Sequence, residues 1–498
     1  MRGWVALVLV LCWLGCVHAR VETLDHKVLE EGDSLSNKIV FITAADSLIG
    51  SDAPTFEVDQ TFSLATKPAS WEDLSTVSII FYPVLDSMRV GIVDEDSALQ
   101  LCCTASLVER KVCEEEGSVL IFPGEEGKVD TIVHKEFEFF EEGETTWRDS
   151  WKVNRSGVYE LLYVNCGGSG LGKVLIDGTL TYTNPFGQLS AETYPLLWFF
   201  GIAAAFVVVL FTAWGITNLI HRSTLISLQH FLSALLVLML VESITWFLMF
   251  WVINLSGRVH WGWVTITVLT SSIKRTAVGL LYLLISLGYG IMNKARITNN
   301  VRLIVLVISF YFLVSTSQEL ITAYIREGVV AAEYEVLLGF ISLVMLFPAV
   351  MIPLGLFWWI CACLIKTIQK LKLRKQEAKL ELYNKILVSL IVAAVVTAMM
   401  IIMETGISLV DSDQLWRVWW IFSAYWFVLF LCLTLSLLKL LHPKRNETWL
   451  AYTRKESIDD EDSVQVELDT LESDLNVNFD FDLGFDDINV EEETSKIS

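Results

Sequence analysis

The sequence predicts an α+β membrane protein, with a β-sandwich, a bundle of seven transmembrane helices and an acidic disordered tail in that order. Three features indicate this: short alternating β-type segments, then seven long apolar segments between 194 and 441, then an acidic stretch without a core-forming pattern. About 20 apolar residues of helix cross a hydrocarbon core roughly 30 Å thick. Backbone groups left unpaired there are costly, so the apolar segments should be helical.

The first residues of the chain indicate a targeting signal. Arg2 precedes a short apolar stretch, and Val17, His18 and Ala19 place small residues where a signal peptidase cleaves. We therefore expect residues 1–19 to be a signal peptide. Residues 20–193 should then form a lumenal domain.

Between Ile39 and Thr183 the pattern is one of short β-favouring runs separated by turn residues, at 77–82, 118–122, 130–140, 157–165 and 173–182. Such spacing is typical of an antiparallel sandwich. No nucleophile with its base and no metal-ligand spacing occurs in it, so the sequence predicts a binding or structural module. It predicts no enzyme, no cofactor and no metal site.

Four cysteines fall in this region: Cys102, Cys103, Cys113 and Cys166. An even number in an oxidising compartment suggests two disulfides. Because a bond between adjacent cysteines is strained, we expect one of the vicinal pair to join Cys113 and the other Cys166. Asn154 opens a glycosylation sequon on the lumenal side.

The predicted membrane spans are 196–219, 225–253, 262–291, 301–323, 336–365, 384–410 and 415–441. Lysine and arginine concentrate in the segments 220–224, 292–302 and 366–385, which the positive-inside rule places in the cytosol. The tail (442–498) should also be cytosolic. Tryptophans at helix ends predict an interfacial belt: Trp261, Trp263, Trp416, Trp419 and Trp420.

Five charged residues fall inside the spans: Glu242, Lys274, Arg275, Glu319 and Glu404. A charge near the midplane costs at least about 2.5–3.5 kcal/mol, so each should face a partner or water. At 1.5 Å per residue, Glu242 overlaps in depth with Lys274 and Arg275, which makes either pairing feasible. Two interpretations stay open: a salt-bridge network that fixes helix register, or a polar cavity for cargo, a lipid headgroup or an ion.

The net charge of −22 is concentrated in the lumenal region and the tail, which argues against nucleic-acid binding. The segment 366–385 alternates leucines with lysines, as in helical extensions at an anionic leaflet. Near the C-terminus, residues 478–487 alternate aromatic residues with aspartates. Such alternation can dock on basic surfaces, so the tail is expected to bind cytosolic sorting adaptors.

Two motifs carry a family resemblance. Asn184, Pro185 and Gly187 belong to an NPFG linker before the first span, and Gly288, Tyr289 and Gly290 to an SLGYGI element that ends the third. Both resemble the lung seven-transmembrane receptor family, in its transmembrane protein 87 branch. The resemblance implies a lumenal GOLD-type β-sandwich and a bundle like that of Wntless, which overlaps rhodopsin-like receptors in shape. It also implies residence in the Golgi.

The resemblance implies a Golgi and endosomal trafficking protein that acts in retrograde transport to the trans-Golgi network. Its expected partners are membrane lipid and a membrane-protein or lipid cargo, recognised by the lumenal domain and the bundle. The alternative is a Golgi cation channel or a protein of pH and ion homeostasis. A signalling receptor is less favoured, because the chain has neither the DRY nor the NPxxY motif.

Overall fold

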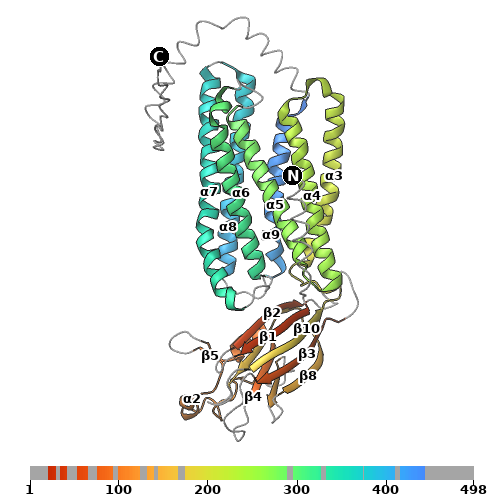
Figure 1. Cartoon of the computed structure of the whole chain (residues 1–498), viewed down its shortest axis with the longest axis vertical. Helices are drawn as coiled ribbons and strands as arrows, with labels where there is room; N and C mark the ends of the chain where they lie inside the picture. The colour runs from red at the N-terminus through yellow and green to blue at the C-terminus, as the bar shows by residue number, and fades with distance from the viewer. Residues whose placement is uncertain are drawn as a thin grey trace, which may run out of the picture. The chain divides into compact units, whose positions relative to one another are not determined.

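The computed structural model describes residues 21–29, 34–41, 53–64, 76–93, 99–123, 132–138, 144–166, 174–288, 295–326, 332–373, 375–409 and 416–443. The expected signal peptide, the tail after Pro443, Tyr289 and Gly290 lie outside these residues. Figure 1 shows a region of strands and a set of long, roughly parallel helices. This arrangement confirms the predicted α+β class.

Among the described residues, eight strands form two antiparallel sheets of four (Figure 1). One sheet has the order β1 (Val21–Leu29), β10 (Val174–Thr183), β3 (Thr55–Leu64), β8 (Glu144–Lys152). The other has the order β2 (Ser34–Phe41), β9 (Gly157–Asn165), β4 (Thr76–Pro83), β7 (Val133–Glu138). The sheets pack face to face, because one buried cluster takes side chains from both.

Aromatic side chains fill this core. Phe56 from one sheet stacks on Phe81 from the other, with ring centroids 4.8 Å apart. Gln60 and Tyr163 exchange two hydrogen bonds across the core, at 2.7 and 3.0 Å, which satisfies two buried polar side chains.

The strands begin earlier than predicted. The alternating pattern was expected from Ile39, but β1 starts at Val21 and β2 at Ser34. A register shift between Leu24 and Lys27 interrupts β1 opposite β10, and such a shift breaks the two-residue period on which the prediction depends. The segment 118–122 is not a strand: Val119 and Ile121 make isolated bridges to Cys102 and Val90.

Residues 84–93 and 99–123 form an excursion between β4 and β7. It contains the 3₁₀ turn η1 (Val84–Arg89), the ribbon of β5 (Ile92–Val93) and β6 (Leu99–Gln100), and the short helix α2 (Ala105–Glu109). Val90 and Leu101 pack on Tyr82 and Leu162, so the excursion covers the outer face of the β9–β4 pair. This apolar cover explains why that sheet has buried residues on both faces.

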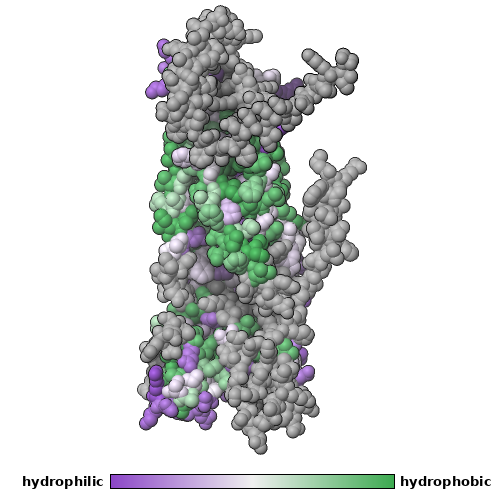
Figure 2. Space-filling model, turned by 60° about the vertical axis from the view of Figure 1, so that its left-hand side comes forward, coloured by the Kyte–Doolittle hydropathy of each residue, from purple (hydrophilic) through white to green (hydrophobic). Residues whose placement is uncertain are grey.

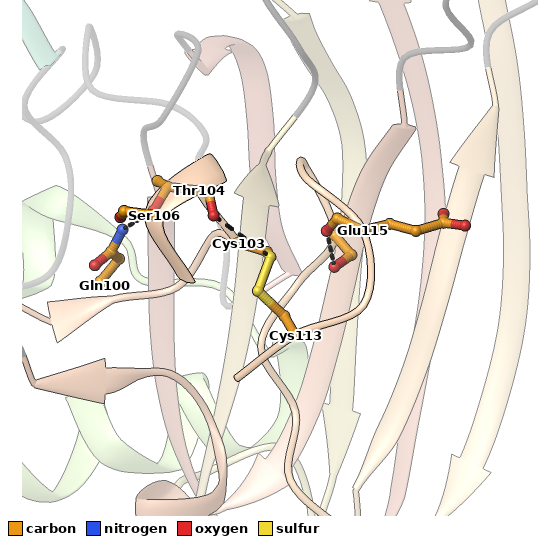
Figure 3. Close-up of a disulfide and its surroundings, with 7 residues drawn as sticks. Gln100, Cys103, Thr104, Ser106, Cys113 and Glu115 are labelled. Carbon is orange, nitrogen blue, oxygen red and sulfur yellow. Dashed lines mark hydrogen bonds between the residues drawn. A yellow bond between two sulfur atoms is a disulfide. The ribbon is translucent and has the colours of Figure 1, made fainter. Parts of the chain in front are cut away.

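One disulfide fastens the excursion to β9 and a second closes a loop within it, and each of the vicinal cysteines takes part in one. Cys102 bonds Cys166, at the end of β9, and Cys103 bonds Cys113, which closes the loop after α2. Figure 3 shows the second disulfide beside Thr104, whose hydroxyl accepts a hydrogen bond from Gln100 at 3.3 Å.

A salt bridge joins the edges of the two sheets. Lys135 on β7 pairs with Asp149 on β8, and its ammonium lies 5.6 Å from the ring centres of both Trp147 and Trp151. The hydrogen bond from Lys135 holds the pKa of the Asp149 carboxyl below its ordinary value.

This shift predicts an acid-dependent contribution to the stability of the sandwich. Because the folded pKa of Asp149 is the lower one, the contribution is complete above the unfolded pKa of about 3.9 and is lost as pH falls through the folded pKa. Asp149→Asn should therefore flatten the loss of stability below about pH 4. Asp59→Asn is the matched control, since the Asp59–Arg148 pair is mostly exposed and should contribute little. Thermal unfolding measured over a series of pH values tests this prediction. An equally flat pH dependence of the melting temperature in both variants would contradict the role of Asp149.

Seven helices long and apolar enough to cross a membrane follow the sandwich in the described residues. They are α3 (Tyr194–Ile220), α4 (Ser227–Ser256), α5 (Trp261–Ser286), α6 (Ala295–Arg326), α7 (Ala332–Leu373), α8 (Glu377–Leu409) and α9 (Trp416–Leu440). On the face shown in Figure 2, hydrophobic side chains cover much of the helical region. The protein is therefore a multi-pass membrane protein with seven spans.

Three details differ from the predicted spans. The third was expected to run to residue 291, but α5 ends at Ser286 because Gly288 adopts a left-handed φ of 84°. The fifth and sixth spans were expected to end at 365 and begin at 384, but α7 runs to Leu373 and α8 begins at Glu377. The helical extensions expected in 366–385 are therefore present, with a turn around Lys375. Trp416 was expected in the interfacial belt but is buried against protein.

Candidate functional site

The centre of the bundle holds a buried ion pair between α4 and α5. Lys274 Nζ lies 2.8 Å from both carboxylate oxygens of Glu242 and donates a hydrogen bond to Oε1. Each residue is 3% exposed. Of the two feasible pairings of Glu242, the structure forms the one with Lys274.

Helix α9 covers this pair. Lys274 Nζ lies 5.3 Å from the ring centre of Phe427 and 4.8 Å from that of Phe430. A cation over an aromatic face is favourable, most of all where water is absent. The pair therefore joins three helices, as a structural ion pair would. Oε2 of Glu242 is in ion-pair contact with Lys274 Nζ but accepts no hydrogen bond within the described part of the chain.

A second pair lies one residue further along α5. Arg275 Nη1 pairs with Glu319 Oε1 on α6, and Ser272 Oγ donates to Glu319 Oε2 at 3.3 Å. Both charged side chains are 27% exposed, so this pair is more accessible than the first. In the described residues, the buried Arg275 Nε and Thr316 Oγ1 have no hydrogen-bond partner. Buried polar atoms of this kind can be satisfied by water or by a ligand.

The structure does not place Glu404 in this interior. The sequence grouped it with the other four charges, but it is exposed, and so are its neighbours from Ile401 to Gly406 on α8. Hydropathy gives the depth of a residue but not the direction in which its helix turns it. Glu404 lies five residues, or about 7.5 Å, before the end of α8 at Leu409. Its side chain is therefore close enough to extend toward the lipid headgroups.

The NPFG linker forms a tight turn that is fastened to α4. Asn184 and Gly187 exchange backbone hydrogen bonds of 2.8 and 3.0 Å, and Asn184 Nδ2 donates to the Leu189 carbonyl. Asn254, near the end of α4, then holds the turn from outside. Its Nδ2 donates to the Phe186 carbonyl at 2.9 Å, and its Oδ1 accepts from the Leu189 amide at 3.2 Å.

Asn254 is the residue that sequence reasoning missed. It opens a second Asn-x-Ser sequon, but its side-chain amide is engaged by the linker, whereas Asn154 in the first sequon is exposed. The only signal in the sequence was its position beside the membrane, just before the end of a span.

The linker requires a glycine at position 187. Its φ is 134°, and a Cβ there would lie 2.5–2.7 Å from the amide group of Asn254. We expect Gly187→Ala to displace Asn254 and to destabilise the fold by about 1–3 kcal/mol, as strained backbone does. Gly157→Ala is the control, because nothing lies within 4 Å of a Cβ at that position. Equal melting temperatures for the two variants would contradict this account.

The SLGYGI element begins at Ser286, the last residue of α5. There the Tyr383 hydroxyl of α8 donates to the Ile285 carbonyl at 3.2 Å, and the Thr367 hydroxyl of α7 donates to the Ser286 carbonyl at 2.9 Å. These bonds satisfy carbonyls that the end of a helix leaves unpaired. Gly288 then turns the chain away from the helix axis.

Comparison with known proteins agrees with this architecture. A family model described as the GOST seven-transmembrane domain matches residues 195–448. The chain is 30% identical to transmembrane protein 87A of Xenopus tropicalis over 286 residues, which cover 57% of this chain and 50% of that protein. It is 27% identical to the human protein of the same name over 289 residues, or 58% of this chain and 50% of that protein. The chain thus spans about half the length of these curated relatives.

A longer match is to an uncharacterized protein of Schizosaccharomyces pombe, 24% identical over 400 residues, or 76% of this chain and 74% of that protein. The family model alone covers just over half of this chain, from the start of α3 to beyond the end of α9. The NPFG motif precedes the start of α3, beside that match, and the SLGYGI motif begins at the end of α5, within it. The chain therefore belongs to the GOST seven-transmembrane family, in its transmembrane protein 87 branch.

Proposed function

We propose that the protein acts in membrane-protein trafficking, in retrograde transport from endosomes to the trans-Golgi network. In this proposal it is a Golgi membrane protein with its N-terminus in the lumen and its C-terminus in the cytosol. The β-sandwich and the bundle recognise a membrane-protein or lipid cargo. The acidic tail recruits sorting adaptors.

The observation that carries the proposal is the attachment of the sandwich to the bundle. Three hydrogen bonds join the linker to Asn254: the Asn254 side-chain amide donates to the Phe186 carbonyl, its side-chain oxygen accepts from the Leu189 amide, and its backbone carbonyl accepts from the Gln188 amide. Disulfides and an exposed sequon at Asn154 suit an oxidising lumen. Because the sandwich is attached to the bundle by these hydrogen bonds, cargo binding to the sandwich can change the position of the helices, which a flexible linker would not allow.

The orientation has a direct test. Protease added to intact Golgi vesicles should digest the tail and spare the disulfide-bonded sandwich. Digestion of the sandwich with a protected tail would reverse the topology and remove the proposal.

The tail has a test that uses the whole chain in knockout cells. Complementation with a chain truncated after Lys455 should leave cargo retrieval defective and redistribute the protein out of the Golgi. Truncation after Asp487 is the matched control, because it keeps the alternating aspartate and phenylalanine segment. The triple variant Phe479→Ala, Phe481→Ala, Phe485→Ala should behave like the shorter chain. Normal localisation of all three would refute adaptor binding by the tail.

One observation favours a second candidate, a cation channel or a protein of Golgi pH and ion homeostasis. The Arg275–Glu319 pair is accessible and has unsatisfied polar atoms beside it, which suits water near a polar path. Fixed positive charge repels cations unless it is paired, and both Lys274 and Arg275 are paired with glutamates. Purified protein in planar bilayers decides: currents changed by Glu319→Gln favour the channel, and silence together with a cargo defect in knockout cells favours trafficking.

A further inference from the structure

The turn η1 contacts the point where membrane helices begin. Val84, its first residue, is buried in a cluster with Val158 of β9, Ala191 of the linker and Trp416. Trp416 is the first residue of the span α9, and Ala191 precedes the span α3 by three residues. The turn therefore lies at the level at which two helices enter the membrane.

The outer side of the same turn is apolar and uncovered. In a 3₁₀ helix, residues three apart lie on the same side. Leu85 and Met88 are related in this way, and they are 46% and 94% exposed. Arg89, which follows, donates from Nε to the Phe122 carbonyl at 3.1 Å, so its guanidinium is turned toward the excursion. Asp86 lies between the two apolar residues in the chain, one third of a turn away from them in a 3₁₀ helix, where it is half-buried and its charge acts on Tyr159 of β9.

We propose that the Leu85–Met88 face of η1 inserts into the lipid leaflet beside α3 and α9, and so forms a second membrane contact of the sandwich. The occupant follows from continuity: the buried side of the turn already packs on the start of a membrane span. Phe186 and Tyr194, stacked at 3.7 Å beside this cluster, are aromatic residues of the kind that favours the membrane interface. Apolar side chains inserted at the headgroup boundary gain free energy in proportion to the area buried.

A comparable apolar pair elsewhere in the excursion serves as the control. Val93 and Leu99 are cross-strand partners on the β5–β6 ribbon and are 66% and 58% exposed. The ribbon packs on the excursion itself, where Ile92 contacts the cluster of Cys103, Leu107 and Leu120. The two apolar pairs are therefore similar in exposure. We expect them to differ in lipid contact, because only the Leu85–Met88 pair lies on a turn that packs against the start of a span.

The test places a benzophenone amino acid at position 88 or 99 of the full chain, reconstituted in phosphatidylcholine vesicles. Position 202 gives the reference, since Ile202 is an exposed residue within α3. After irradiation and mass spectrometry, we expect phospholipid adducts at 88 and 202 and none at 99. Absence of adducts at 88, with adducts at 202, would overturn the proposal. Equal adducts at 88 and 99 would also overturn it, because lipid contact would then not be specific to η1.

Discussion

Lys274→Met, with Glu242 retained, is expected to destabilise the bundle by about 3–5 kcal/mol, since it leaves a buried carboxylate without its partner. Glu242→Leu should cost a similar amount, because it leaves a buried ammonium. Both residues are 3% exposed, so lipid headgroups and water offer little compensation. Unfolding of each variant in lipid nanodiscs measures the loss.

The double variant Lys274→Met, Glu242→Leu distinguishes a structural pair from a functional one. Two apolar side chains of similar size can replace a buried pair with little loss, so stability should return close to that of the parent chain. The pair Arg275→Met, Glu319→Leu is the internal control. Its single variants should cost less, because each charge left behind is 27% exposed. If the Lys274 and Glu242 variants all fold normally but lose activity, the pair serves function and not register.

Removal of the Cys102–Cys166 disulfide is expected to destabilise the sandwich more than removal of Cys103–Cys113. The two bonds close loops with sequence separations of 64 and 10 residues. The chain-entropy relation gives about 4 kcal/mol for the longer loop and about 3 kcal/mol for the shorter one. The longer bond also fastens the excursion to β9, whereas the shorter one closes a local loop.

Paired serine variants are the appropriate comparison, because a single change would leave a thiol free to exchange. Amide hydrogen exchange in β4 and β9 reports the free energy of opening of the sandwich. We expect faster exchange in Cys102→Ser, Cys166→Ser than in Cys103→Ser, Cys113→Ser. Equal acceleration would show that loop length does not control the contribution of these bonds.

Much of the fold follows from the sequence. The apolar spans are set by hydrocarbon thickness, so their number and approximate limits could be predicted. The strands were predictable where a two-residue alternation was regular, as in β9, and were missed where a register shift interrupted it, as in β1. The pairing of the vicinal cysteines with two different partners followed from the geometry of the disulfide itself.

The candidate site was only partly predictable. Lys274 and Arg275 are adjacent, and successive helical side chains point about 100° apart, so the two residues face different neighbours. Lys274 reaches Glu242 on α4, and Arg275 reaches Glu319 on α6. Sequence gives each residue a depth but not the rotation of its helix, so it could not predict that Glu404 is exposed on α8.

By itself, the sequence determined that a β-rich module precedes seven membrane helices, because hydrophobic length and strand periodicity are local properties of the chain. The tertiary structure alone decided which charges are paired, that Asn254 fastens the linker, and that Trp416 packs on the sandwich instead of on lipid. These outcomes depend on which helix faces meet, and that is settled by packing between segments far apart in the chain.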